Sequence, residues 1–296
     1  MSKFNILSFD GGGIKGVLSI RLIQRIRDQF PELLEVVDMY VGTSTGGIIA
    51  LALAAGVPID TIKNLYIEKG KDIFHRNWWR VFGITGPKYS NHGLRREIDR
   101  LFADEQLGDL KSKVLISSFD LKSSQKPYRW KPKFFHNFGD DRDDPVRIAD
   151  VAMYTSAAPT YFPAVDGYVD GGMVANNPSM AAICQVLDDR YGDQVLLEDI
   201  SLLSVGTGVN YQYIDGDRYN FGAKDITKIV GILLDGTKSV PEYQCSVILD
   251  KKYFRLDPID EQNTKLDDVK AIGHLLEIAD RWPLDDIIAW LENFWK

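Results

Sequence analysis

The same local pattern occurs twice in succession near the start of the chain, and it constrains the fold more than any other feature. Residues 4–9 form an apolar run typical of a strand, three glycines follow, and a helical periodicity then passes through Leu18 and Leu22. A second short strand over 39–41 leads into another glycine-rich turn and an apolar helix over 48–55. Strand, glycine turn and helix in succession are typical of βαβ units. We therefore predict an α/β fold on a largely parallel sheet.

The rest of the chain predicts one domain, residues 1–296, because we find no internal repeat, low-complexity tract or linker in it. Pro132 places one of the later strands near a sheet edge, since proline cannot donate to a central ladder. In chain order we expect irregular helix over 62–102, strands over 114–119 and 128–135, helix over 146–156, a hairpin and turn over 166–172 and a core strand over 200–205. The remainder should be mostly helical, with one strand-like run over 252–256.

Composition excludes several classes of protein. The 42 acidic residues outnumber the 35 basic ones, for a net charge of -7, which argues against a nucleic-acid polymer as partner. A local patch can still oppose the global sign at a membrane surface. Cys184 and Cys245 match no disulfide framework or zinc pattern, so we expect no metal and two small buried thiols. No signal peptide or apolar run of membrane-spanning length is evident, which predicts a cytoplasmic protein.

The second glycine turn carries the candidate nucleophile. Gly42-Thr43-Ser44-Thr45-Gly46 lies between a strand and a helix, the context that a G-x-S-x-G match requires. The small residues Gly42, Gly46 and Gly47 allow neighbouring backbone to approach closely, and the turn lifts the Ser44 hydroxyl above the sheet edge. Ser44 also starts a helix, where free N–H groups favour developing negative charge. The alternative is that Ser44 serves only as a helix cap.

The first glycine turn predicts an anion site. Consecutive glycines in Asp10-Gly11-Gly12-Gly13-Ile14-Lys15-Gly16 let successive N–H groups point into one concavity. Either a phosphate or the oxyanion of an acyl intermediate could be held there. A G-x-G-x-x-G match is weak alone, and the Ser44 turn one unit later favours the oxyanion. A tight turn that requires positive φ is the remaining alternative.

A serine nucleophile requires a general base, and histidine is the usual one. Among the four histidines only His274 follows the candidate carboxylate Asp170, and it lies on an expected amphipathic helix without an orienting motif. Asp170 itself ends an extended run and precedes Gly171 and Gly172, so it could reach a second loop. Asp-Gly is also a common turn dipeptide, and the residues alone leave these alternatives open.

Three of these segments, in this order, resemble the signatures of the patatin-like phospholipases. They are the glycine loop of residues 10–16, the Ser44 turn of residues 42–46 and the Asp170 turn of residues 170–172. Residues 155–163, Thr-Ser-Ala-Ala-Pro-Thr-Tyr-Phe-Pro, resemble the family's segment before the catalytic aspartate. The resemblance covers about residues 4–260, and the helical part over 261–296 lies beyond it.

The resemblance implies a three-layer α/β/α sandwich on a mostly parallel sheet, and a lipid acyl hydrolase that works through an acyl-enzyme intermediate. Ser44 would attack the ester carbonyl and Asp170 would accept its proton, a dyad without histidine. The N–H groups of Gly11, Gly12, Gly13 and Thr45 would hold the oxyanion. Asp10, Lys15, Gly16, Gly42, Gly46, Gly171 and Gly172 would complete the motifs. Lys15 stands where many members have arginine, so it would orient the loop or a phosphate head group less rigidly. Neither metal nor cofactor is implied.

Membrane or micellar lipid is the expected partner. Trp78 and Trp79 lie among cations, as in interfacial segments, and suggest a peripheral docking lip between residues 73 and 89. Alternatively they pack over the sheet. Two functional alternatives stay open: a phospholipase effector of bacterial antiphage defence activated by a second messenger, and an acyltransferase that uses the same serine. Head-group preference and oligomeric state are not readable from the sequence.

Overall fold

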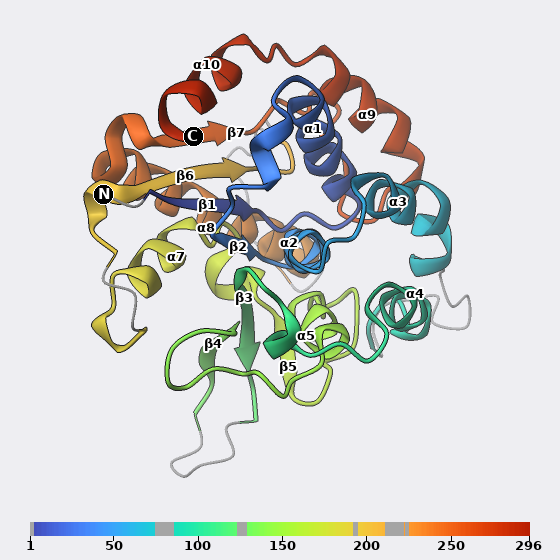
Figure 1. Cartoon of the computed structure of the whole chain (residues 1–296). Helices are drawn as coiled ribbons and strands as arrows, with labels where there is room; N and C mark the ends of the chain where they lie inside the picture. The colour runs from blue at the N-terminus through green and yellow to red at the C-terminus, as the bar shows by residue number, and fades with distance from the viewer. Residues whose placement is uncertain (1–2, 75–85, 123–128, 192–194, 211–221, 223–224) are drawn as a thin grey trace.

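The computed structural model describes residues 3–74, 86–122, 129–191, 195–210, 222 and 225–296. A seven-stranded sheet forms its centre, and six of the strands follow the order β4-β3-β2-β1-β6-β7 (Figure 1). The strands are β1 (Phe4–Phe9), β2 (Met39–Gly42), β3 (Lys113–Asp120), β4 (Lys131–His136), β5 (Tyr168–Asp170), β6 (Ile200–Val205) and β7 (Tyr253–Leu256). The pairs β3·β2, β2·β1, β1·β6 and β6·β7 are parallel, whereas β4 and β5 run antiparallel to β3.

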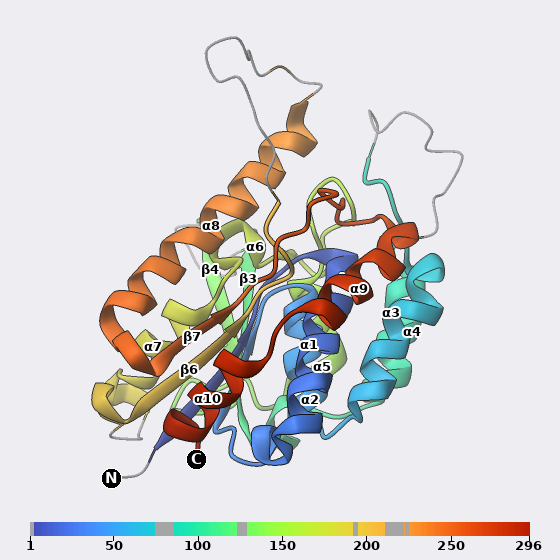
Figure 2. The same ribbon diagram turned by 90° about the horizontal axis from the view of Figure 1, so that it is seen from above.

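Helices cover both faces of the sheet, which makes three layers (Figure 2). On β1, Leu7 and Phe9 face a core shared with α1 and α2, and Ile6 faces a second core shared with α7 and α8. Strands buried on both faces are typical of parallel sheets in α/β proteins. The helices are α1 (Gly16–Gln29), α2 (Thr45–Ala54), α3 (Ile59–Ile73), α4 (His92–Phe102), α5 (Ile148–Thr155), α6 (Gly172–Ala175), α7 (Ser179–Val186), α8 (Ile226–Leu249), α9 (Ile272–Arg281) and α10 (Asp285–Phe294). The predicted α/β sandwich is therefore confirmed.

Two strands, β2 and β5, pair with the same edge of β3. This arrangement brings the residues after β2 close to the end of β5. β2 pairs with the first half of β3 and ends at Gly42, opposite Ile116. β5 runs antiparallel along the second half, and its last residue, Asp170, lies opposite Ser118. β4 occupies the other edge of β3 over its whole paired length. The residues that follow β2 therefore meet the end of β5.

Several local predictions can be compared with these elements. The strand expected over 128–135 is β4, and it pairs only with β3, so Pro132 does lie on an edge strand. The expected hairpin turns at Asp166 and Gly167, which have φ of 49° and 87°, as a two-residue turn between antiparallel strands requires. Cys184 is exposed, so its predicted burial is wrong, because its position on α7 faces solvent. The assignment of 1–296 to a single domain stays a prediction. No helix in the described part of the chain is long and apolar enough to cross a membrane.

Candidate active site

Ser44 lies in a strained turn between β2 and α2. Its φ is 54° and its ψ is -124°, a conformation that a residue with a Cβ rarely adopts. The turn is tight: a Cβ on Gly42 would lie 2.2 Å from the Gly46 carbonyl oxygen, and one on Gly46 would lie 2.4 Å from that of Phe9. The close backbone approach expected from the glycine spacing is present.

The Ser44 side chain does not cap α2, although Ser44 holds the N-cap position. Its hydroxyl lies near enough to the Asp170 carboxylate to lower the pKa of that group, and its backbone N–H donates to Oγ1 of Thr155 at 2.8 Å. The reading of Ser44 as a simple cap therefore fails. The two residues that the resemblance paired line the same pocket, although 126 positions separate them.

Asp170 is almost completely buried, with 4% of its surface exposed. Burial raises the pKa of its carboxyl from 3.8 to about 6, against the opposing effect of hydrogen bonds from the Ser44 hydroxyl and the Gly172 N–H. The Gly172 N–H lies 2.7 Å from Oδ1 of Asp170. At neutral pH the carboxyl is mostly ionised yet close to its titration point, which suits a general base.

The glycine loop adjoins this pair, but its N–H groups are not all available. The N–H of Gly11 donates to the carbonyl of Asn176 at 3.0 Å, so the prediction that Gly11 helps to bind an oxyanion is wrong for this arrangement. The N–H groups of Gly12 and Gly13 donate to no acceptor among the described residues. Both glycines line the same pocket as Ser44, and so does Thr45.

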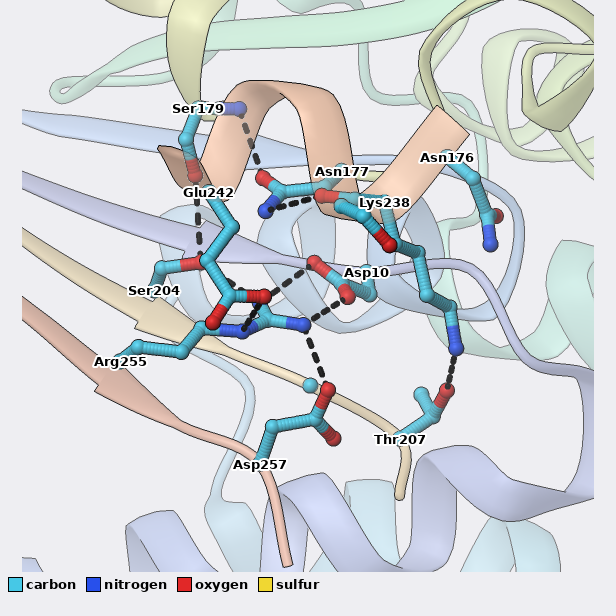
Figure 3. A network of polar contacts seen from close by, with 12 residues as sticks. Asp10, Asn176, Asn177, Ser179, Ser204, Thr207, Lys238, Glu242, Arg255 and Asp257 are labelled. Atoms are coloured by element: carbon cyan, nitrogen blue, oxygen red, sulfur yellow. Dashed lines mark hydrogen bonds and ion pairs between the residues drawn. The ribbon is translucent and has the colours of Figure 1, made fainter. Parts of the chain in front are cut away.

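Asp10, the first residue of the glycine loop, is held in a network of polar contacts (Figure 3). It is fully buried and forms two hydrogen bonds with the Arg255 guanidinium, at 3.0 and 2.6 Å. Burial raises the pKa of the Asp10 carboxyl above its usual value, and the positive charge of Arg255 opposes that rise. Arg255 also contacts Asp257 at 2.6 Å and Ser204 at 2.7 Å. Asp10 is thus held in a buried polar cluster with Arg255, Asp257 and Ser204.

Lys15 points away from the pocket. Its side chain is buried, and its ammonium lies 3.4 Å from the Gly208 carbonyl and 3.5 Å from Oδ1 of Asn210. Burial, assisted by the nearby charge of Lys238, lowers the pKa of Lys15 to about 8. In this arrangement the Lys15 ammonium contacts the loop of residues 208–210, and its function in the motif stays a prediction. Gly16 begins α1, and Gly171 links β5 to α6.

An apolar pocket opens beside the Ser44–Asp170 pair and is lined by both residues. Ser156 lies in its wall, and its buried hydroxyl has no hydrogen-bond partner among the residues that the structure describes, so a bound molecule could satisfy it. Ser156 belongs to the segment 155–163, which was noted only as a resemblance. The apolar residues of the wall are Ile14, Ile48, Leu65, Ile73, Phe74, Leu94, Ala158, Pro159, Tyr161, Phe162, Met173, Val230, Leu234 and Leu266.

Helix α8 holds the loops of the site, and the sequence did not indicate this. Pro241 lies inside α8 and has no N–H to donate to the carbonyl of Thr237. That carbonyl instead accepts the Asn177 N–H, at 3.5 Å. One turn earlier, the carbonyl of Leu234 accepts Nδ2 of Asn176 at 3.2 Å. The proline thus frees an acceptor that ties the segment after Asp170 to α8.

Lys238 connects α8 to the glycine loop. Its ammonium donates to Oγ1 of Thr207 at 3.3 Å, and that hydroxyl donates to the carbonyl of Gly11 at 3.0 Å (Figure 3). Thr237 adds a hydrogen bond of 3.3 Å to the carbonyl of Gly172. One helix therefore contacts both loops that meet at the Ser44–Asp170 pair.

The described histidines take no part in the site. His274 contacts Asp260 at 3.1 Å, and Nδ1 of His136 contacts the Phe138 carbonyl at 2.8 Å. In the described ranges no histidine bonds to Ser44 or Asp170, and no group of three or more His, Cys, Asp or Glu could hold a metal ion. Trp78 and Trp79, the suggested docking lip, lie outside the described residues.

Comparisons with known proteins identify the family. The family described as patatin-like phospholipase matches residues 7–183. The Bacillus subtilis protein CotR, named as a sporulation hydrolase, is 31% identical over all of this chain and 99% of its own. A cGAMP-activated phospholipase of Escherichia coli is 33% identical over 69% of this chain and 62% of its own. The crystal structure of VipD from Legionella pneumophila matches 94% of this chain and 67% of its own at 13% identity and a TM-score of 0.43, and the assignment does not rest on it. The chain belongs to the patatin-like phospholipase family.

Proposed function

We propose that the chain hydrolyses carboxylic ester bonds of acyl lipids, with Ser44 as the nucleophile and Asp170 as its base. The observation that carries this proposal is that both side chains line one apolar pocket, with the Ser44 hydroxyl near enough to lower the pKa of Asp170. The hydroxyl is poised to lose its proton to a buried carboxylate while it attacks an ester carbonyl. The apolar wall suits an acyl chain rather than a polar substrate.

In the first step Ser44 Oγ bonds to the ester carbonyl carbon, and Asp170 accepts the hydroxyl proton. The N–H groups of Gly12, Gly13 and Thr45 supply the donors for the oxyanion. When the tetrahedral intermediate collapses, Asp170 returns the proton to the leaving alcohol and an acyl group stays on Ser44. Water then repeats the sequence, with Asp170 again accepting and returning the proton, and releases the fatty acid.

Fluorophosphonate labelling followed by peptide mapping tests the nucleophile. Ser44 should carry the label, and Ser44→Ala should remove it. Ser156→Ala is the matched control, because Ser156 is the other serine in the pocket lining, and this variant should still be labelled. Labelling that persists in Ser44→Ala, or moves to Ser156, contradicts the assignment.

Release of fatty acids from mixed phospholipids, lysophospholipids and galactolipids, followed by mass spectrometry, tests the reaction and its substrate. Ser44→Ala should abolish release. Parallel reactions with and without cGAMP separate a constitutive enzyme from a triggered one. Triggering by cGAMP is tested because the Escherichia coli relative is named as a cGAMP-activated phospholipase. Release without the nucleotide indicates a constitutive enzyme, and release only in its presence indicates a triggered one.

A further inference from the structure

An exposed apolar stripe runs along the outer side of α8. Ile226, Leu233, Val240 and Val247 are spaced seven residues apart and are 55%, 52%, 58% and 62% exposed. Seven residues are almost two full turns, so these side chains share one side of the helix. Tyr243, 71% exposed, lies between the last two and completes what we call the α8 stripe.

The stripe is placed where nothing in the described fold covers it. α8 forms the outer layer on its side of the sheet (Figure 2). Its inner side is occupied, because Cys245 and Leu249 are buried in the core and Lys238 contacts Thr207. An apolar row of this length on the opposite side marks an interaction surface.

The stripe lies on the helix that also forms part of the pocket wall. Val230 and Leu234 line the pocket beside Ser44, and they lie on the same helix within a turn of Ile226 and Leu233. An acyl chain that leaves a lipid surface at the stripe would therefore reach the pocket wall along one helix. This placement on one helix favours a lipid surface as the occupant.

Area and charge support the same occupant. A helix of this length spans about 36 Å, so a stripe about 10 Å wide offers about 360 Å² per copy. That is less than half of the roughly 800 Å² per partner in a stable protein interface, which argues against a second copy held by α8 alone. The charges on α8 balance, with Lys228 and Lys238 against Asp235 and Glu242. A neutral stripe on a chain of net charge -7 fits a zwitterionic surface and disfavours an anionic one.

We propose that α8 docks the chain on a zwitterionic lipid surface, lying in the plane of the interface with the α8 stripe inserted among the acyl chains. The proposal deepens the proposed function, since it rests on lipid as the substrate. α8 lies on the surface rather than crossing it.

Flotation of the purified chain with phosphatidylcholine vesicles tests the proposal, with Ser44→Ala as the parent so that no lipid is consumed. Val240, Tyr243 and Val247 are replaced together by glutamine, which adds no charge and keeps a good helix propensity. The variant should bind about tenfold more weakly or worse, because three apolar insertions are lost. The matched control replaces Val36, Trp130 and Leu196, which lie outside α8 and are 36%, 74% and 55% exposed, by glutamine, and it should bind like the parent.

Equal binding by the α8 variant and the parent, with both folded by circular dichroism, overturns the proposal. So does a parent that fails to bind phosphatidylcholine or that prefers phosphatidylglycerol. A parent that is a dimer in light scattering, and that becomes monomeric in the α8 variant, assigns the stripe to a second copy instead. Binding is read without catalysis, so these outcomes are independent of the labelling and fatty-acid release that test Ser44.

Discussion

Replacing Asp170 by asparagine should stabilise the fold while it removes activity. Burial holds the pKa of Asp170 at about 6 in the folded chain, against 3.8 when the carboxyl is in water. Two pH units correspond to about 3 kcal/mol, because each unit is 1.36 kcal/mol. The ionised carboxylate therefore lowers the free energy of unfolding at neutral pH by an amount of this order. Asparagine has no charge to bury, and its amide can still accept the Gly172 N–H.

The sign of the pH dependence follows from the direction of the shift. Well below pH 4 the Asp170 carboxyl is protonated in both the folded and the unfolded chain, so it does not lower the free energy of unfolding. Between about pH 4 and 6 the unfolded carboxyl loses its proton while the folded one keeps it, so stability falls as pH rises. Above about pH 6 the whole cost is present. The advantage of Asp170→Asn should therefore be small at pH 4 and largest at pH 7 and above.

Thermal unfolding between pH 4 and 8 measures this advantage. For a chain of this length, about 3 kcal/mol raises the midpoint by about 5 °C at pH 7. Asp188→Asn is a control of opposite sign, because Arg190 lowers the pKa of Asp188 to about 2, and that variant should gain nothing at any pH. Ester hydrolysis by Asp170→Asn should fall by about 10² to 10⁴, the range for loss of a general base. An Asp170→Asn variant that is less stable than the parent at pH 7, or a gain that does not change with pH, refutes the reasoning.

Two further substitutions test the surroundings of the pair. Ser44→Gly should raise the free energy of unfolding by about 1–2 kcal/mol over Ser44→Ala, because only glycine relieves the strain at φ 54°; equal midpoints in urea for the two inactive variants would contradict this. Arg255→Met should lower the free energy of unfolding by about 3–5 kcal/mol, because the Asp10 carboxylate is left buried without its partner. Adding Asp10→Asn should recover much of that loss, and a double variant no more stable than Arg255→Met would show that the charge is not the cause.

The parts of the fold that could be predicted depend on local patterns. The runs before the two glycine turns read as strands, and the spacing of Gly42, Ser44 and Gly46 identifies a turn that is physically tight. The Asp-Gly pair at 166–167 likewise predicts its hairpin. In each case the residues that determine the local structure lie within a few positions of one another, so the sequence alone is enough to predict it.

The contacts that complete the site are distant in sequence, and this is why the residues alone left them open. Asp170 meets Ser44 only because β5 continues the edge of β3 at which β2 ends. The Gly11 N–H is taken by Asn176, 165 residues later, so a glycine-rich loop does not by itself reveal which of its donors are free. Arg255 has no motif, and its partner Asp10 lies near the other end of the chain.

Pro241 lies inside α8, where a proline is not expected from the sequence. A proline ordinarily ends or kinks a helix, yet α8 continues from Ile226 to Leu249. The carbonyl that loses its helical donor finds the N–H of Asn177 instead. The cost of the missing hydrogen bond is thereby reduced, and the segment that follows Asp170 gains an anchor.

Burial raises the pKa of Asp170 toward the value that a histidine side chain has in water. An aspartate in water titrates near 3.9 and is a weak base for a serine hydroxyl, whereas an imidazole titrates near 6.5. With the pKa of Asp170 at about 6, the carboxylate approaches imidazole in basicity and still sits against the hydroxyl it is proposed to deprotonate. Because the same desolvation costs stability, a variant that exposes Asp170 to water should become more stable and less active together. A change that moves stability and activity in the same direction would mean that burial is not the source of the base strength.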